Sequence, residues 1–104
     1  MTTESNGHIR FKVVLIGTVK ADLRRFHQEL MQHGKGNQFL QALRSLNDRL
    51  SKDPRTFGET LYRLPALKIM VYQGIINPLV VTFGVHEELA IVFVHVVKIL
   101  STPE

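Results

Sequence analysis

The sequence predicts an α+β domain in which one strand and a helical hairpin precede three further strands. Apolar residues recur at helical spacing in two segments before Pro54, and in dense extended runs after it. No helical segment separates the later runs, so the strand–helix–strand repeat of a parallel sheet is missing. The predicted order is β-α-α-β-β-β, with a single domain over residues 10–100 between two polar tails at 1–9 and 101–104.

The first strand is predicted over residues 10–17. Its segment, Arg-Phe-Lys-Val-Val-Leu-Ile-Gly, is rich in β-branched and aromatic residues and ends at a glycine. The unbroken apolar stretch at 13–16 predicts burial on both faces of this strand.

Two amphipathic helices follow. The first is predicted to begin after Thr18, whose hydroxyl suits an N-cap, and to end at His33 and Gly34. The second is predicted from a cap at Asn37 to the Asp53-Pro54 pair. Their apolar stripes consist of Leu23, Phe26 and Leu30 in the first helix and Phe39, Leu43, Leu46 and Leu50 in the second. We expect the two helices to pack as a hairpin over one face of the sheet.

Three strands are predicted at residues 67–72, 79–86 and 89–100, each dense in Val, Ile, Leu and Phe. Turns are predicted at Gln73-Gly74 and Asn77-Pro78, and a hairpin at Glu87-Glu88. Such short connections make the three strands antiparallel. The last strand is apolar on both faces, which predicts a homodimer or another partner on the face that the helices leave open.

The composition fits one cytoplasmic globular domain. The 104 residues include no cysteine, which excludes disulfides and thiolate chemistry. The start of the chain lacks the basic and apolar segments of a signal peptide, and the apolar runs are too short to cross a bilayer as helices. No metal-ligand spacing or phosphate-binding loop is present, so no metal or other cofactor is expected.

The positive charge is unevenly distributed. Residues 10–68 contain 12 Lys and Arg against 5 Asp and Glu, whereas the remainder is net acidic. A basic field attracts RNA, DNA or an acidic protein, and it also serves simply to keep a surface soluble. The candidate nucleic-acid-binding residues are Lys20, Arg24, Arg25, Arg44, Arg49 and Lys68.

Three segments carry a family resemblance. Residues 53–61, Asp-Pro-Arg-Thr-Phe-Gly-Glu-Thr-Leu, resemble the link between helical hairpin and sheet in the RelE/ParE-like toxin superfamily. Residues 78–83, Pro-Leu-Val-Val-Thr-Phe, and 91–94, Ile-Val-Phe-Val, resemble strands of that superfamily. The resemblance implies a toxin of a bacterial toxin–antitoxin system, which acts either as a ribosome-dependent mRNA endonuclease or as a gyrase inhibitor. An antitoxin protein and the ribosome with its mRNA are the partners that it implies.

The residues that could act in RNA cleavage are His95, Arg63 and Tyr72. Such a reaction needs a base, an acid and cations that stabilise the charge on the phosphate. The mRNA-cleaving members of the superfamily that this chain resembles typically carry arginines on their second and third strands, where this chain has Met70-Val71-Tyr72-Gln73 and Leu79-Val80-Val81-Thr82. A catalytically silent binding module of the same fold is therefore the alternative. In strict alternation, His95 and Lys98 would lie on opposite faces of the last strand.

Overall fold

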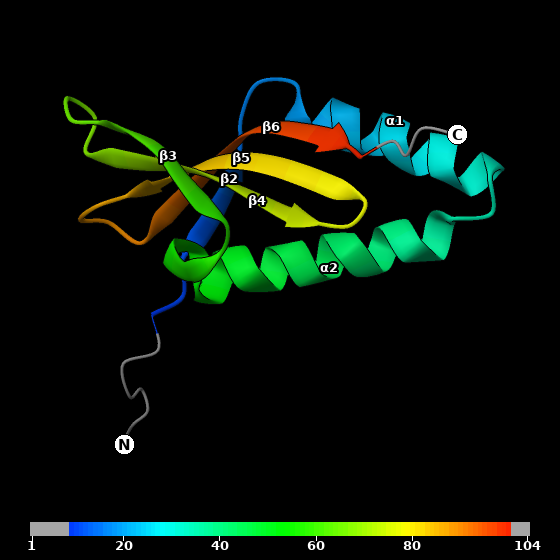
Figure 1. The fold of residues 1–104 in the computed structure, drawn as a ribbon, viewed down its shortest axis with the longest axis horizontal. Coiled ribbons are helices and arrows are strands. Elements are labelled where there is room, and N and C mark those ends of the chain that lie inside the picture. The colour runs from blue at the N-terminus through cyan, green and yellow to red at the C-terminus, as the bar shows by residue number, and fades with distance from the viewer. Residues whose placement is uncertain (1–8, 101–104) are drawn as a thin grey trace, which may run out of the picture.

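The computed structural model describes residues 9–100, and its fold is the predicted α+β arrangement (Figure 1). The order is β2 (Lys12–Leu15), α1 (Val19–Gln32), α2 (Gly36–Lys52), a 3₁₀ turn η1 (Pro54–Thr56), β3 (Glu59–Leu64), β4 (Ile69–Ile76), β5 (Leu79–His86) and β6 (Ile91–Ile99). Except for Ile9, which is exposed, both predicted tails lie outside the described residues. Neither α1 nor α2 is long and apolar enough to cross a membrane.

The five strands form one sheet in the order β2-β6-β5-β4-β3. The strands β3 to β6 form an antiparallel meander, which confirms the antiparallel prediction for the last three strands. The first strand, β2, pairs in parallel with the last one, β6, so that Val13 lies opposite Val92. The first and last strands of the described chain are therefore neighbours at one edge of the sheet.

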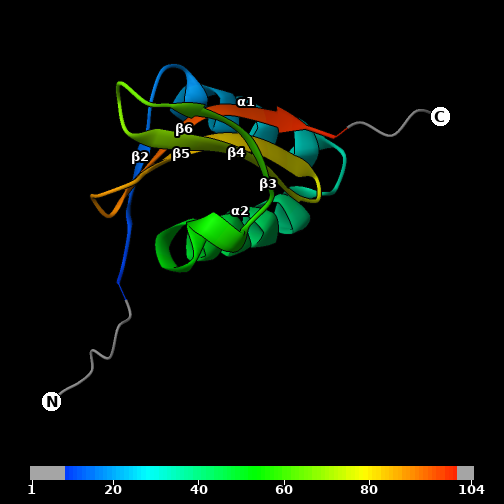
Figure 2. The same cartoon turned by 60° about the vertical axis from the view of Figure 1, so that its left-hand side comes forward.

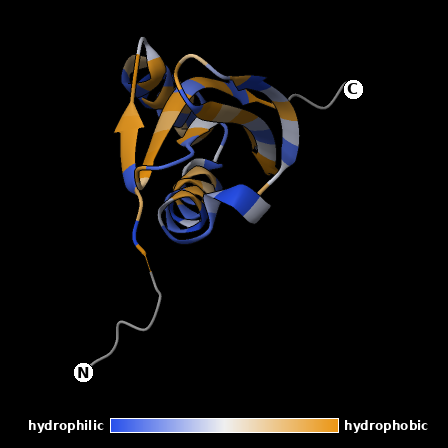
Figure 3. Cartoon of the chain, turned by 90° about the vertical axis from the view of Figure 1, so that its left-hand side faces the viewer, coloured by the Kyte–Doolittle hydropathy of each residue, from blue (hydrophilic) through white to orange (hydrophobic). Residues whose placement is uncertain are grey.

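Both helices pack on one face of this sheet, as predicted. Figure 2 shows α2 running beneath the strands, and Figure 3 shows its apolar side turned towards them. The centre of the core is Phe83, fully buried between the parallel rings of Phe57 and Tyr72, whose centroids lie 5.6 and 5.5 Å away. The same core contains buried residues of both helices, of strands β4, β5 and β6, and of the segment that follows η1. They include Val19, Phe39, Leu46, Leu50, Val81 and Val94. We refer to the opposite side of the sheet as the open face.

The strand β3 was not predicted. Residues 53–61 were expected to be a link, yet Glu59–Leu64 pairs with β4 and raises the number of strands from four to five. All six of its residues are exposed, because β3 is an edge strand with no helix over it. An exposed edge strand lacks the apolar alternation that reveals a half-buried strand in a sequence.

The predicted turn at Gln73-Gly74 is wrong, because both residues lie inside β4 and pair with Thr82 and Val81. The turn between β4 and β5 is at Asn77-Pro78 alone, which the sequence did predict. Gly74 is required for packing: a Cβ at this position would lie 2.5 Å from Cε2 of Phe57.

Three local predictions also differ from the structure. The hydroxyl of Thr18 donates to the Asp22 carboxylate at 2.9 Å and makes no cap bond to the backbone. The residue before α2 is Lys35, so Asn37 lies within the first turn of the helix instead of capping it. The strand β2 is only partly buried, and Leu15 is 43% exposed, because β2 forms an edge of the sheet.

Candidate functional surfaces

The open face contains an apolar hollow of about 430 Å³. Its walls come from the residue after β2, the end of β3, the β3–β4 connection, the start of β4 and the strands β5 and β6. The lining residues are Ile16, Leu64, Leu67, Ile69, Gly84, Phe93 and His95. Gly84 keeps the floor low, since a Cβ there would stand 2.6 Å from Cγ2 of Ile69 and 3.7 Å from Nε2 of His95. The hollow can therefore receive a large apolar group beside a single imidazole.

His95 lies at a β-bulge, and this overturns the expected alternation of β6. Phe83 pairs with Val94 while its neighbour Thr82 pairs with Val96, so that His95 is the extra residue. An extra residue reverses the alternation beyond it. Val97 is accordingly buried in the core, and Lys98 joins His95 on the open face. The prediction that His95 and Lys98 lie on opposite faces is wrong.

The environment of His95 favours its neutral form. Burial in the apolar hollow lowers the pKa of the imidazole, because a charged ring loses more hydration than a neutral one. At neutral pH the ring therefore offers one N–H donor and one acceptor without a charge. A neutral imidazole can accept a proton or form hydrogen bonds, but it lacks the positive charge that would bind a phosphate.

The structure does not bring the three candidate catalytic residues together. Tyr72 is buried on the helix-covered face, where its ring stacks on Phe83, whereas His95 lies on the open face. Arg63, on β3, is held by two hydrogen bonds to the carboxylate of Glu87, of which the one from Nη2 to Oε1 is 2.8 Å long. These contacts join the β3–β4 and β5–β6 hairpins at one end of the sheet.

The contact between Arg63 and Glu87 shifts the pKa of both side chains. The hydrogen bond from the guanidinium lowers the pKa of the Glu87 carboxyl, and the same contact raises the pKa of Arg63. Lys68 makes a parallel contact, with 3.0 Å between its Nζ and Oε2 of Glu88. Arg63 and Lys68, which adjoin the lining residues Leu64 and Leu67 in sequence, are thus paired with carboxylates of the neighbouring hairpin.

The remaining basic candidates have different surroundings. Arg25 pairs with Asp22 at 3.1 Å and lies over the ring of Phe26, while Arg49 lies 5.1 Å from the ring centroid of Phe57. Lys20 and Arg24 border a depression between α1 and α2, and Arg44 is exposed on α2. Lys68 belongs to the turn between β3 and β4, far along the chain from these helical residues. The six candidates therefore differ in their local contacts.

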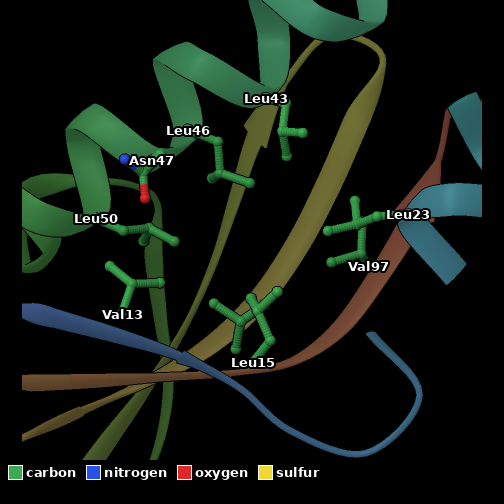
Figure 4. Close-up of a pocket in the computed structure, with 9 residues that line it drawn as sticks. Val13, Leu15, Leu23, Leu43, Leu46, Asn47, Leu50 and Val97 are labelled. Atoms are coloured by element: carbon green, nitrogen blue, oxygen red, sulfur yellow. The ribbon is translucent and has the colours of Figure 1, made fainter. Parts of the chain in front are cut away.

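A second apolar surface, which the sequence did not reveal, lies on the helix-covered side. Between α1, α2 and the β2–β6 edge is a groove of about 350 Å³ whose only polar lining residue is Asn47 (Figure 4). Its apolar lining consists of Val13, Leu15, Leu23, Leu43, Leu46, Leu50, Val94 and Val97. The leucine stripe of α2 was the only hint of this groove in the sequence. An apolar stripe on one helix does not show how far that helix diverges from its neighbour.

Among residues 9–100 no three His, Asp or Glu side chains lie close enough together to hold a metal ion. Comparison with protein-family models, curated proteins and solved structures finds no match for this chain. The class of the protein is therefore defined by its fold and by its two apolar surfaces. It is an α+β domain with a five-stranded mixed sheet, an apolar hollow on the open face and an apolar groove between the two helices and the β2–β6 edge.

Proposed function

We propose that this chain is a RelE/ParE-like toxin-type protein that acts by binding a protein target through the open face of its sheet. The observation that carries the proposal is the hollow of about 430 Å³, in which six of the seven lining residues are apolar or glycine. Apolar pockets that take up one large side chain are typical anchor points of protein interfaces. A partner that inserts a leucine or an aromatic ring would also meet the neutral imidazole of His95.

The charges around the hollow favour a protein over RNA as the target. Binding to RNA depends on cations that neutralise phosphates. Arg63 and Lys68 are instead paired with Glu87 and Glu88. An RNA phosphate would have to displace these carboxylates, whereas an apolar side chain would not.

The proposal is tested by expressing the protein in bacteria and replacing a residue of the hollow. Leu67 is 59% exposed, so Leu67→Asp should leave the fold intact and abolish growth inhibition. The matched control is Leu89→Asp, because Leu89 is 54% exposed but does not line the hollow. Ribosome-bound mRNA should stay intact throughout. Normal growth with the unmodified chain, or equal inhibition by Leu67→Asp, would contradict the proposal.

Ribosome-dependent mRNA cleavage is the second candidate, and one observation favours it. The bulge in β6 places Lys98 on the same face as His95, so that a base and a cation share one surface. In this case His95→Ala and Lys98→Ala should each reduce mRNA cleavage at unchanged stability. Tyr72 should not contribute, since its ring is buried on the other side of the sheet.

A further inference from the structure

The turn between β5 and β6, at residues 87–90, is closed by the imidazole of His86. The turn lies beyond the last paired residues of the two strands. Within it, Nδ1 of His86 accepts hydrogen bonds from the backbone N–H groups of Glu88 and Leu89, both 3.0 Å long. An imidazole nitrogen accepts only while it carries no proton, so the ring is neutral and has its proton on Nε2. The shape of the turn therefore depends on an unprotonated His86.

The same turn holds the connection at residues 65–68, which contributes Leu67 to the wall of the hollow. The N–H of Glu87 donates to the carbonyl of Lys68 at 2.8 Å, and Nζ of Lys68 lies 3.0 Å from Oε2 of Glu88. Lys68 has a φ of 56°, in the left-handed region that residues with a side chain rarely adopt and that persists only where neighbouring contacts hold it. The position of the Leu67 wall is thus maintained from the turn.

The ion pairs of this region do not fix the wall by themselves. The side chains of Lys68 and Glu88 are 54% and 62% exposed, and ion pairs between exposed side chains stabilise a fold only slightly. The carboxylates of Glu87 and Glu88 reach their partners because the backbone of the turn has one particular shape. That shape is set by the two hydrogen bonds to His86.

We propose that His86 is a positioning residue for the hollow and that protonation of its ring releases the Leu67 wall. A protonated Nδ1 is a donor, so it no longer binds the N–H groups of Glu88 and Leu89 and instead attracts the carboxylates of Glu87 and Glu88. Histidine is the side chain that ordinarily changes its charge between about pH 5 and 8. The inference rests on the proposed function in taking the hollow as the binding site, and it adds that acid weakens binding there.

The charges around the turn allow the ring to act without Glu87 losing its charge. The hydrogen bond from Arg63 lowers the pKa of Glu87, so this carboxylate is still ionised when an imidazole takes up its proton. A charged ring is attracted by the two carboxylates of the turn and repelled by the surrounding cations. The charged and titratable groups on the elements that contact the turn or share its face are Glu87, Glu88, Arg55 of η1, Arg63 of β3, Lys68, Lys12 of β2 and His95 of β6.

The first experiment observes the turn in the full chain without a target. At about pH 7.5 a long-range proton–nitrogen NMR spectrum should show the His86 tautomer with its proton on Nε2. As the pH is lowered to about 5.5, the amide signals of Glu88, Leu89 and Lys68 should move together with those of the ring. His86→Asn is the matched control, because an asparagine oxygen accepts from the N–H two residues on and does not titrate. In this variant the three amide signals should stay in place.

The second experiment measures the hollow with p-cresol, the side-chain analogue of tyrosine, which is uncharged over this pH range. Binding is followed by the methyl signals of Leu67 and Ile69, which line the hollow. The affinity of the unmodified chain should fall about threefold to tenfold between the two pH values, the effect of losing one hydrogen bond. His86→Asn should lose clearly less, and its remaining loss measures the contribution of His95, which both proteins contain. His86→Phe keeps a ring without an acceptor and should bind weakly at both pH values.

Two results would overturn the inference. One is an equal pH dependence of p-cresol binding in the unmodified chain and in His86→Asn. The other is a turn that opens without the wall, in which the amides of Glu88 and Leu89 follow the ring while Lys68 and Leu67 do not. No binding of p-cresol at either pH would contradict the proposed function instead. Release of the wall is then decided by hydrogen exchange of the Lys68 amide, which should be faster in acid than in His86→Asn.

Discussion

The ring of Phe57 occupies the space that a side chain at residue 74 would need. A Cβ built on Gly74 would lie 2.5 Å from Cε2 and 2.6 Å from Cζ of this ring. Phe57 follows the 3₁₀ turn η1, and Gly74 lies in the middle of β4. The contact fixes the polypeptide that leaves α2 against the sheet and keeps Phe57 stacked on Phe83.

Gly74→Ala should destabilise the protein by about 1–3 kcal/mol, the usual cost of forcing an extra carbon into a packed core. The measurement is the midpoint of urea unfolding. In the background of Phe57→Ala the same change should cost much less, because the ring that it meets is gone. Equal costs in the two backgrounds would show that Phe57 is not the reason for glycine at this position.

Phe83→Ala should destabilise the domain by about 3–5 kcal/mol, because the ring is fully buried between two others. Tyr72→Phe is the companion change: it retains the stacked ring and removes only the hydroxyl. Since Tyr72 lies on the helix-covered face, this change should leave growth inhibition and RNA binding unaltered. A loss of activity with unchanged unfolding midpoint would restore Tyr72 as a catalytic candidate.

Glu87→Gln should remove a pH-dependent part of the stability. The hydrogen bond from Arg63 holds the folded pKa of Glu87 below its unfolded value, so the carboxylate stabilises the native state at neutral pH. This contribution is lost as the pH falls from the ordinary carboxyl range through the lowered folded value. Urea midpoints of the unmodified protein and Glu87→Gln should differ at pH 7 and converge in acid. Glu59→Gln is the control, since Glu59 forms no ion pair with the described residues.

His95 should produce a second pH effect, in a higher range. Its folded pKa is lowered by burial, so the unfolded chain binds a proton more readily than the native protein. Stability should therefore decrease as the pH falls from the ordinary histidine value to the lowered one. His95→Leu should remove this slope, and a carbon-detected NMR titration of the imidazole should show the lowered pKa directly. A histidine that titrates at its ordinary value would contradict the burial of His95 in the hollow.

The sequence predicted the elements that carry a strong apolar signal. The leucine stripe of α2 was recognised by its helical period, and β5 and β6 were recognised as dense runs of apolar residues between turn signals. The strand β3 was missed because it is exposed throughout, and Gly74 was misread because a glycine needed for close packing resembles a glycine needed for a turn.

The candidate site was less predictable, because it depends on register. One extra residue in β6 decides whether Lys98 faces the core or the open side, and nothing in the local sequence marks His95 as that residue. The pairing of Arg63 with Glu87 joins positions 24 residues apart through two hairpins. Such contacts exist only after the strands have aligned.

The parallel pairing of β2 with β6 also constrains how the protein can fold. Because Val13 lies opposite Val92, the first strand has no sheet partner until almost all of the domain has been synthesised. The antiparallel meander and the helical hairpin can form from local contacts, whereas this closure joins distant parts of the chain and should be among the later steps. Until then the apolar residues of β2 remain accessible, so a nascent or truncated chain that ends before β6 is the form most exposed to aggregation.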